Sequence, residues 1–288
     1  MSAQRPFTID FIGIGAQKAG TTWLAECLME HPQIYVPKKK ELDYWNRIKH
    51  CPATRQRQYS GFDEYKQQFA GAKPGQLLGE FSTHYIYDPE SAKLIHEYSP
   101  SVKIIAILRD PVYRALSQYA HTRKLIPVPD TFEEASKKFP EFIERGFYYE
   151  QLKRYYDLFP AEQIKVVLFE DLKEDPERVI GGVYSFLGVD SSFPPEALHR
   201  KVNAKQAVKR ETARNAKNMI KRSAAGLWLV RKLSHTTAKQ LLERLYLAPD
   251  TSHYEVASST RNELVSRFTA DKRQLEHLLG RTIDSWSF

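Results

Sequence analysis

The sequence predicts an α/β fold, in which a parallel sheet is flanked by helices and a helical extension follows at the C-terminus. Three segments are largely apolar and rich in β-branched residues, which is typical of strands buried on both faces. Each is followed by a stretch with apolar residues at helical spacing. This alternation indicates a parallel sheet covered on both sides, and we expect one domain over residues 1–288.

The predicted elements follow in a regular order. The strands are expected at residues 7–14, 76–81, 102–108 and 163–169, of which 76–81 has the weakest pattern. The helices after the three apolar strands are expected at residues 21–30, 112–124 and 176–187. From about residue 204 the pattern is mostly helical, and its clearest amphipathic stretch is 264–279.

Composition excludes several classes of protein. The chain is 42% hydrophobic, which excludes a disordered or collagen-like protein. Two cysteines, Cys27 and Cys51, cannot form a disulfide framework. The sequence has no run of about 18 apolar residues, so we expect no transmembrane helix. The first residues lack the apolar core of a signal peptide. We therefore expect a cytoplasmic protein.

The net charge of +8 is concentrated in one segment. Residues 200–222 contain nine basic residues and a single acidic one, Glu211, and this excess equals the whole net charge. Such a run is most often a solvated helix face. It also suits an acidic partner, such as a phosphorylated cofactor, a glycan, a nucleic acid or an anionic lipid.

A glycine-rich loop follows the first predicted strand. Residues 15–22, GAQKAGTT, have the G-x-x-x-x-G spacing of a phosphate loop between a strand and a helix, which makes the sheet P-loop-type. Nucleotide hydrolases place a lysine after the second glycine, whereas this chain has Thr21 there and carries Lys18 inside the loop. No clear Walker B acid ends the strand at 102–108. The loop predicts a nucleotide with a short anhydride and no essential Mg²⁺; the alternative is a turn without a ligand.

A second anion site is predicted after the strand at 102–108. Arg109 lies at the carboxyl end of that strand, where open α/β sheets bind ligands. Ser117 follows about two helical turns later. A guanidinium and a hydroxyl in this arrangement can bind one phosphate. An ordinary surface ion pair of Arg109 is the alternative, and the nearby loop with Lys18 favours the phosphate.

Several motifs resemble those of sulfotransferases that use 3′-phosphoadenosine 5′-phosphosulfate (PAPS). QKAGTTWL at 17–24 is similar to their 5′-phosphosulfate loop, and RDPVYRALSQY at 109–119 is similar to their 3′-phosphate motif. KELDYW at 40–45 and GEFSTHY at 79–85 resemble the branch with the heparan sulfate N- and O-sulfotransferase domains and bacterial relatives. Residues 146–189 and the final LLGRTIDSW also resemble that branch. Two departures are Asp43 for a usual histidine and Phe81 for a common lysine.

The resemblance implies transfer of a sulfuryl group from PAPS to an acceptor hydroxyl, on a carbohydrate or a lipid, without a metal. It implies Glu41 as the base, and Lys18 is expected to stabilise the leaving phosphate. The second candidate for the base is His84, for which a hydrogen-bonded structural role is the alternative. The cofactor-binding residues are expected to be Gln17, Lys18, Ala19, Gly20, Thr21, Thr22, Trp23, Arg109 and Ser117. Within the basic segment the candidates for the 3′-phosphate are Lys205, Lys209 and Arg210.

Two other functions remain open. A P-loop nucleotide kinase would also bind a nucleotide, and Thr21 at the Walker lysine position argues against it. A non-enzymatic polyanion-binding protein would use residues 200–222 and would not need Lys18. The apolar stretch 224–233 is either a buried helix, which we favour, or a patch that meets a lipid-linked acceptor. We expect a bacterial enzyme whose partner is its acceptor substrate, with no nucleic-acid partner and no strong case for a membrane contact.

Overall fold

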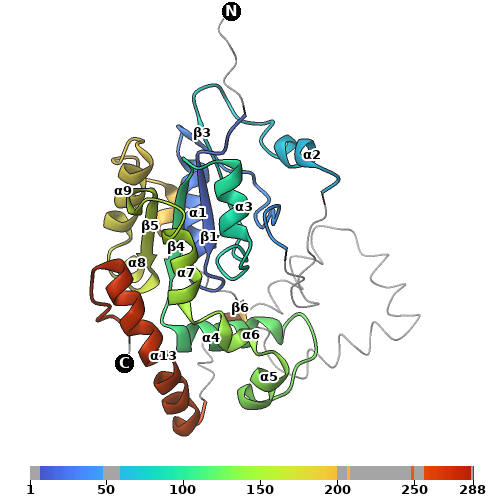
Figure 1. The fold of residues 1–288 in the computed structure, drawn as a ribbon, viewed down its shortest axis with the longest axis vertical. Coiled ribbons are helices and arrows are strands. Elements are labelled where there is room, and N and C mark those ends of the chain that lie inside the picture. The colour runs from blue at the N-terminus through green and yellow to red at the C-terminus, as the bar shows by residue number, and fades with distance from the viewer. Residues whose placement is uncertain (1–6, 48–58, 200–205, 208–247, 250–255, 287) are drawn as a thin grey trace, which may run out of the picture. The chain divides into compact units, whose positions relative to one another are not determined.

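The structure is a computed structural model that describes residues 7–47, 59–199, 206–207, 248–249, 256–286 and 288 (Figure 1). The chain divides into two compact units, residues 1–200 with 256–288 and residues 201–255. Whether both belong to one sulfotransferase domain stays a prediction. The described residues of the second unit form two short antiparallel strands, β6 (Gln206–Ala207) and β7 (Ala248–Pro249).

Five parallel strands form the sheet of the first unit. They are β1 (Phe11–Gly15), β2 (Ile34–Tyr35), β3 (Leu77–Phe81), β4 (Lys103–Leu108) and β5 (Ile164–Leu168). Their spatial order is β2-β3-β1-β4-β5, and all neighbours pair in parallel. The parallel sheet predicted from the sequence is confirmed. β2 was not predicted, because a strand of two residues has no periodic pattern.

The strand order places a ligand-binding position at the end of β1. The chain leaves β1 toward β2 and β3 on one side, then crosses to β4 and β5 on the other. Such a reversal opens a crevice at the carboxyl ends of the central strands, where open α/β sheets bind ligands. Every residue of β1 is buried, and so is every residue of β4 after Lys103.

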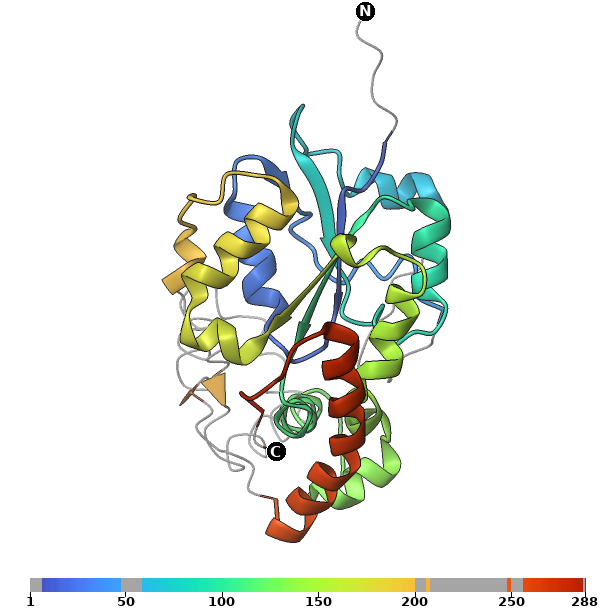
Figure 2. The same cartoon turned by 60° about the vertical axis from the view of Figure 1, so that its left-hand side comes forward.

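Helices cover both faces of this sheet. The helices are α1 (Thr21–Glu30), α2 (Phe62–Gln67), α3 (Ser91–Tyr98), α4 (Pro111–Thr122), α5 (Phe132–Lys138), α6 (Glu141–Glu144), α7 (Tyr148–Tyr156), α8 (Phe169–Glu174), α9 (Pro176–Leu187) and α13 (Ser258–Leu279). Two 3₁₀ turns are η1 (Ala161–Gln163) and η2 (Glu196–His199). Figure 2 shows α1 and α9 on one face of the sheet and α3 and α7 on the other. None of the helices in these described ranges is long and apolar enough to cross a bilayer.

Local sequence signals set the starts of α4 and α9. The Asp110 carboxylate accepts hydrogen bonds from the amides of Val112 at 2.9 Å and Tyr113 at 3.2 Å, and Pro111 is the first helical residue. The Asp175 carboxylate caps α9 in the same way, and Pro176 follows it. An acidic cap followed by proline is a strong helix start. These caps explain why both predicted helices are found within two residues of their expected bounds.

The C-terminal extension packs against helices α7 and α4 through α13. Its apolar side chains Leu264, Phe268 and Leu275 are buried, as the amphipathic pattern predicts. Asp271 accepts hydrogen bonds from the amides of Tyr148 at 2.9 Å and Tyr149 at 3.1 Å, at the start of α7. This carboxylate therefore serves as a remote N-terminal cap for α7. The apolar stretch at 224–233 lies outside the described residues.

Candidate functional site

The loop between β1 and α1 has the geometry of an anion site. Lys18 has φ 69° and Gly20 has φ 99°, so the backbone turns through the left-handed region twice. A Cβ on Gly20 would lie 2.9 Å from the ring of Phe169, so only glycine fits. No side chain caps α1. The first amides of a helix lack intrahelical partners, and with the helix dipole they attract an anion.

Among the residues that the structure describes, two buried polar side-chain atoms of this region have no hydrogen-bond partner. They are an amide oxygen of Gln17 in the loop and the indole nitrogen Nε1 of Trp23 on α1. Buried polar groups without a partner are rare in native proteins, so each calls for a ligand or a special reason. Gln17 lies in the loop and suits a bound nucleotide. Trp23 is only 2% exposed, which places its ring mainly in the core.

Arg109 is attached to the same loop. It follows β4 directly, and its Nη1 donates a hydrogen bond to the carbonyl oxygen of Lys18 at 3.2 Å. Its guanidinium lies 4.7 Å from the ring centre of Phe169. Burial lowers the pKa of Arg109. Nε of Arg109 is also buried without a partner. The structure therefore brings the two predicted phosphate sites together.

Ser117 lies on α4 and is half-buried. Within residues 7–47 and 59–199, no hydrogen bond joins Ser117 to Arg109, so a shared phosphate between them stays a prediction. The remaining 3′-phosphate candidates, Lys205, Lys209 and Arg210, lie outside the described residues.

Glu41 is fixed at the end of β3. Its amide donates a hydrogen bond to the carbonyl of Phe81, the last residue of that strand, at 2.9 Å. Its Oε2 accepts two hydrogen bonds from Thr83, from the amide at 2.7 Å and from the hydroxyl at 2.9 Å. Glu41 has φ 58° and Asp43 has φ 55°, a rare backbone conformation for residues with a side chain. Such positions are often found at functional sites.

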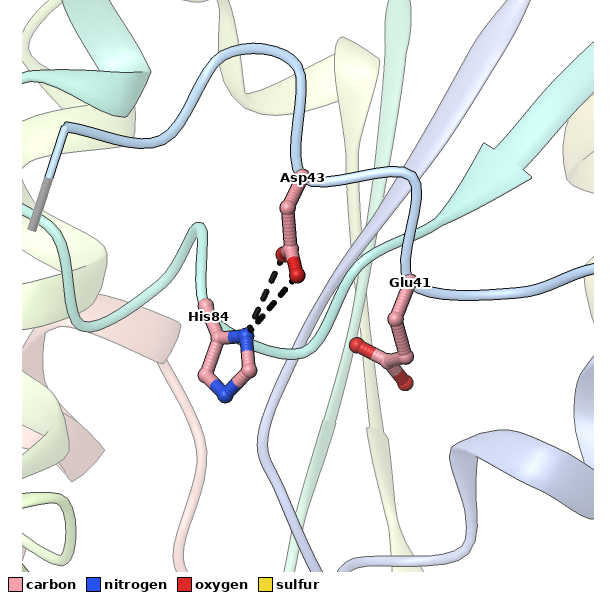
Figure 3. A group of neighbouring side chains, drawn as sticks. All are labelled: Glu41, Asp43 and His84. Carbon is pink, nitrogen blue, oxygen red and sulfur yellow. Dashed lines mark hydrogen bonds and ion pairs between the residues drawn. The ribbon is translucent and has the colours of Figure 1, made fainter. Parts of the chain in front are cut away.

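Asp43 and His84 form a buried pair beside Glu41 (Figure 3). The Nδ1 atom of His84 lies 3.1 and 3.3 Å from the two carboxylate oxygens of Asp43. One potential ligand atom from each of Glu41, Asp43 and His84 lies within 4.8 Å of the others. Both candidate bases therefore belong to one site. Such a group could also hold a cation, so the expected absence of a metal stays a prediction.

Lys40 connects this site to the phosphate loop. Its Nζ lies 3.4 Å from the hydroxyls of both Thr21 and Thr22, the first residues of α1. The same Nζ lies 3.8 Å from Oε1 of Glu41. The start of α1 and the predicted base are thus parts of one continuous site.

Sequence reasoning gave no role to Lys40 or Asp43. Lys40 is the third of three consecutive lysines, and only the structure shows that it turns inward while Lys38 and Lys39 are exposed. Asp43 was noted as a departure from a usual histidine. The signal that could have identified it is that an aspartate and a histidine occupy two adjacent motifs of the same predicted site.

Comparison with known proteins assigns the family. The model of the sulfotransferase domain family matches residues 8–242. The chain belongs to the sulfotransferase domain family. This sulfotransferase-family protein is 26% identical to a solved sulfotransferase from Alicyclobacillus acidocaldarius, with a TM-score of 0.70, over 98% of this chain and 100% of that chain. It shares its fold with mouse sulfotransferase SULT7A1 complexed with PAP, at a TM-score of 0.54 and 16% identity, over 94% of this chain and 88% of that chain.

Curated relatives of this sulfotransferase-family protein are longer. The membrane-associated sulfotransferase kil1 of Dictyostelium discoideum is 24% identical over 273 residues, which cover 63% of this chain and 56% of the relative. Human heparan sulfate glucosamine 3-O-sulfotransferase 6 is 28% identical over 184 residues, which cover 61% of this chain and 51% of the relative. The chain thus spans about half the length of these relatives. The resemblance found in the sequence is confirmed at the level of the family.

A buried acid next to the candidate site contributes to its structure. Glu80 of β3 is 1% exposed, and its Oε1 accepts hydrogen bonds from the hydroxyls of Tyr65 at 2.7 Å and Tyr85 at 3.1 Å. The hydroxyl of Ser82 donates to its Oε2 at 3.0 Å and accepts from the amide of Asp43 at 2.9 Å. Burial raises the pKa of Glu80 to about 7. Glu80 therefore links β3 and α2 to the segment that carries Asp43.

Proposed function

We propose that this protein transfers a sulfuryl group from PAPS to an acceptor hydroxyl. The observation that carries the proposal is that one site contains both the anion-binding start of α1 and a carboxylate able to accept a proton. Lys40 lies 3.4 Å from the hydroxyls of Thr21 and Thr22 and 3.8 Å from Glu41, which joins these two parts. An enzyme that moves an anionic group to a hydroxyl needs this combination of charge stabilisation and base.

The residues present fit the donor nucleotide. PAPS would supply the sulfuryl group together with a phosphate leaving group. Lys18, Thr21, Thr22 and the amides at the start of α1 would bind its 5′-phosphosulfate, and Lys18 would stabilise the charge that develops on the leaving phosphate. Arg109 and Ser117 would bind the 3′-phosphate. The buried Oε1 of Gln17 has no donor among the described residues, which supports a ligand that supplies a hydroxyl or amino group there.

Glu41 is proposed as the base that receives the proton of the acceptor hydroxyl. Its Oε2 already accepts two hydrogen bonds from Thr83, so the proton would go to Oε1. His84, held through Nδ1 by Asp43, is the alternative base.

The acceptor is proposed to be a carbohydrate or a lipid. Relatives named as heparan sulfate sulfotransferases support a carbohydrate, and a relative named as membrane-associated keeps a lipid open. The same proposal includes a bacterial, cytoplasmic enzyme that needs neither a metal nor a nucleic acid.

Thermal stability with nucleotides tests the donor assignment. Adenosine 3′,5′-bisphosphate (PAP) should raise the melting temperature without Mg²⁺, because a ligand that binds the folded state stabilises it. ATP with Mg²⁺ should have little effect. Stabilisation by ATP with Mg²⁺ but not by PAP would favour a P-loop kinase instead. A screen of glycans, glycolipids and phenols with PAPS carrying a radioactive sulfuryl group would then identify the acceptor.

A further inference from the structure

One ammonium group lies between the two halves of the site. Lys40 is half-buried, with its side chain 14% exposed, and its Nζ has oxygens on two sides. On one side are the hydroxyls of Thr21 and Thr22 at 3.4 Å, and on the other is Oε1 of Glu41 at 3.8 Å. An anion bound at the start of α1 that faces Glu41 must therefore approach Lys40.

Charge at this point matters for transfer. A sulfuryl group carries negative charge, and the carboxylate of Glu41 is negative in the form that accepts a proton. Two such charges at a few ångströms repel each other, and because the Glu41 side chain is 37% exposed, water screens part of this repulsion. A cation between them offsets this repulsion and leaves the carboxylate close enough to act on the acceptor hydroxyl.

The neighbouring position 81 offers no charge of its own. Phe81 stands where the resembling sequences commonly have a lysine, and its ring is 1% exposed. The ring covers Gly13 of β1, where a Cβ would come within 2.0 Å of it. The Nζ of Lys40 lies 5.8 Å from the centre of this ring. Lys40 thus places an ammonium group near the end of β3, where residue 81 supplies none.

We propose that Lys40 is a catalytic residue whose ammonium binds a non-bridging oxygen of the transferred sulfuryl group, between α1 and Glu41. The proposal rests on the proposed sulfuryl transfer. In that reaction the acceptor oxygen gains the sulfuryl group as its proton passes to Oε1 of Glu41, and the leaving phosphate keeps the electron pair of the broken S–O bond. Lys40 keeps its proton and forms no covalent bond. Its contribution is to hold and neutralise the group in transit.

Binding of PAPS and PAP without an acceptor tests this role, because the two nucleotides differ by the sulfuryl group. Calorimetric titration would compare the wild type with Lys40→Met, Lys40→Arg and the matched control Lys39→Met. Lys39 is the adjacent lysine and is exposed. Lys40→Met should weaken PAPS binding about tenfold or more, the scale of one charge-assisted hydrogen bond, and PAP binding less than threefold. Lys40→Arg should retain most of the PAPS affinity, and Lys39→Met should change neither.

The outcomes separate this inference from the proposed function. Wild-type protein that binds neither nucleotide would contradict the proposed function. Wild-type protein that binds both, with a Lys40→Met variant whose affinities are unchanged or fall equally for both, would overturn the role of Lys40 alone. If Lys40→Met melts at a much lower temperature than the wild type, Lys40→Gln replaces it in the titrations. Its affinities for PAPS and PAP are then judged by the same criteria.

Discussion

Two residues can act as the base, and their hydrogen bonds leave different atoms for the reaction. Glu41 has Oε2 engaged by Thr83 and presents Oε1 toward Lys40. His84 has Nδ1 engaged by Asp43. A neutral histidine that donates from Nδ1 carries its lone pair on Nε2. The proposed proton acceptors are therefore Oε1 of Glu41 and Nε2 of His84.

Replacement of each base candidate distinguishes them. Glu41→Gln keeps size and hydrogen bonding but removes the proton acceptor, so sulfuryl transfer to the acceptor found by the screen should fall about 100-fold or more. PAP binding should be nearly unchanged. His84→Asn should have a milder effect. Turnover and calorimetric PAP binding are the measurements. An active Glu41→Gln enzyme with an inactive but folded His84→Asn enzyme would assign the base to His84.

Asp43 should act as a positioning residue for His84. Its carboxylate accepts from Nδ1, and this favours the tautomer with the lone pair on Nε2. Asparagine tolerates the left-handed backbone of residue 43, but it removes the charge that selects this tautomer. Asp43→Asn should shift His84 toward the tautomer protonated on Nε2. ¹⁵N NMR of histidine-labelled protein measures this, and the His84→Asn variant assigns the signal. An unchanged tautomer would show that Asp43 does not set the state of the ring.

At the scale of secondary-structure elements, some features depend on neighbouring residues alone, and others depend on contacts between distant segments. Apolar runs and helix starts in which proline follows aspartate are local signals, so β1, β3, β4, β5, α4 and α9 could be predicted from them. The glycine spacing likewise located the phosphate loop before α1. The fold-back of residues 40–43 over the end of β3 depends on positive φ values at Glu41 and Asp43 and on a hydrogen bond to Phe81. No residue pattern specifies that turn, so the contacts that Lys40 and Asp43 make could not be predicted from the sequence.

Because Arg109 contacts the loop, Arg109→Ala and Ser117→Ala should differ in their effect on nucleotide binding at the proposed 3′-phosphate site. Arg109 also donates to the carbonyl of Lys18, so Arg109→Ala should loosen the loop as well as remove a phosphate contact. It should weaken binding of both PAP and AMP, and of PAP more. Ser117→Ala should weaken PAP alone, because only PAP carries the 3′-phosphate. Calorimetric titration of the two nucleotides provides the comparison. If both variants prefer PAP over AMP as strongly as the wild type does, the 3′-phosphate is bound elsewhere.

For the first unit as a whole, the site and the core share one buried hydrogen-bond network. Glu80 accepts from Tyr65 of α2, from Tyr85 and from Ser82, and Ser82 in turn accepts from the amide of Asp43. Residues far apart in the sequence are thereby held around one carboxyl group. This arrangement makes the stability of the fold sensitive to the protonation of Glu80, because a buried group can hold its proton more tightly when folded than when unfolded.

The free energy of unfolding should therefore depend on pH through the protonation of Glu80. Burial raises its pKa from 4.5 to about 7. Because the folded pKa is raised, its contribution to stability is fully present below the unfolded pKa and is lost as pH rises through about 7. A shift of this size corresponds to about 3 kcal/mol.

Comparison with a neutral variant isolates that contribution. Glu80→Gln has no charge to bury, so the free energy of unfolding of the wild type relative to Glu80→Gln should fall between about pH 4.5 and 7. Urea unfolding at pH 5, 6, 7 and 8 measures this difference. Burial also raises the pKa of Asp271 to about 6, and that contribution remains in both proteins. It therefore cancels in the comparison. Parallel pH profiles for the two proteins would show that Glu80 does not gain its proton on folding.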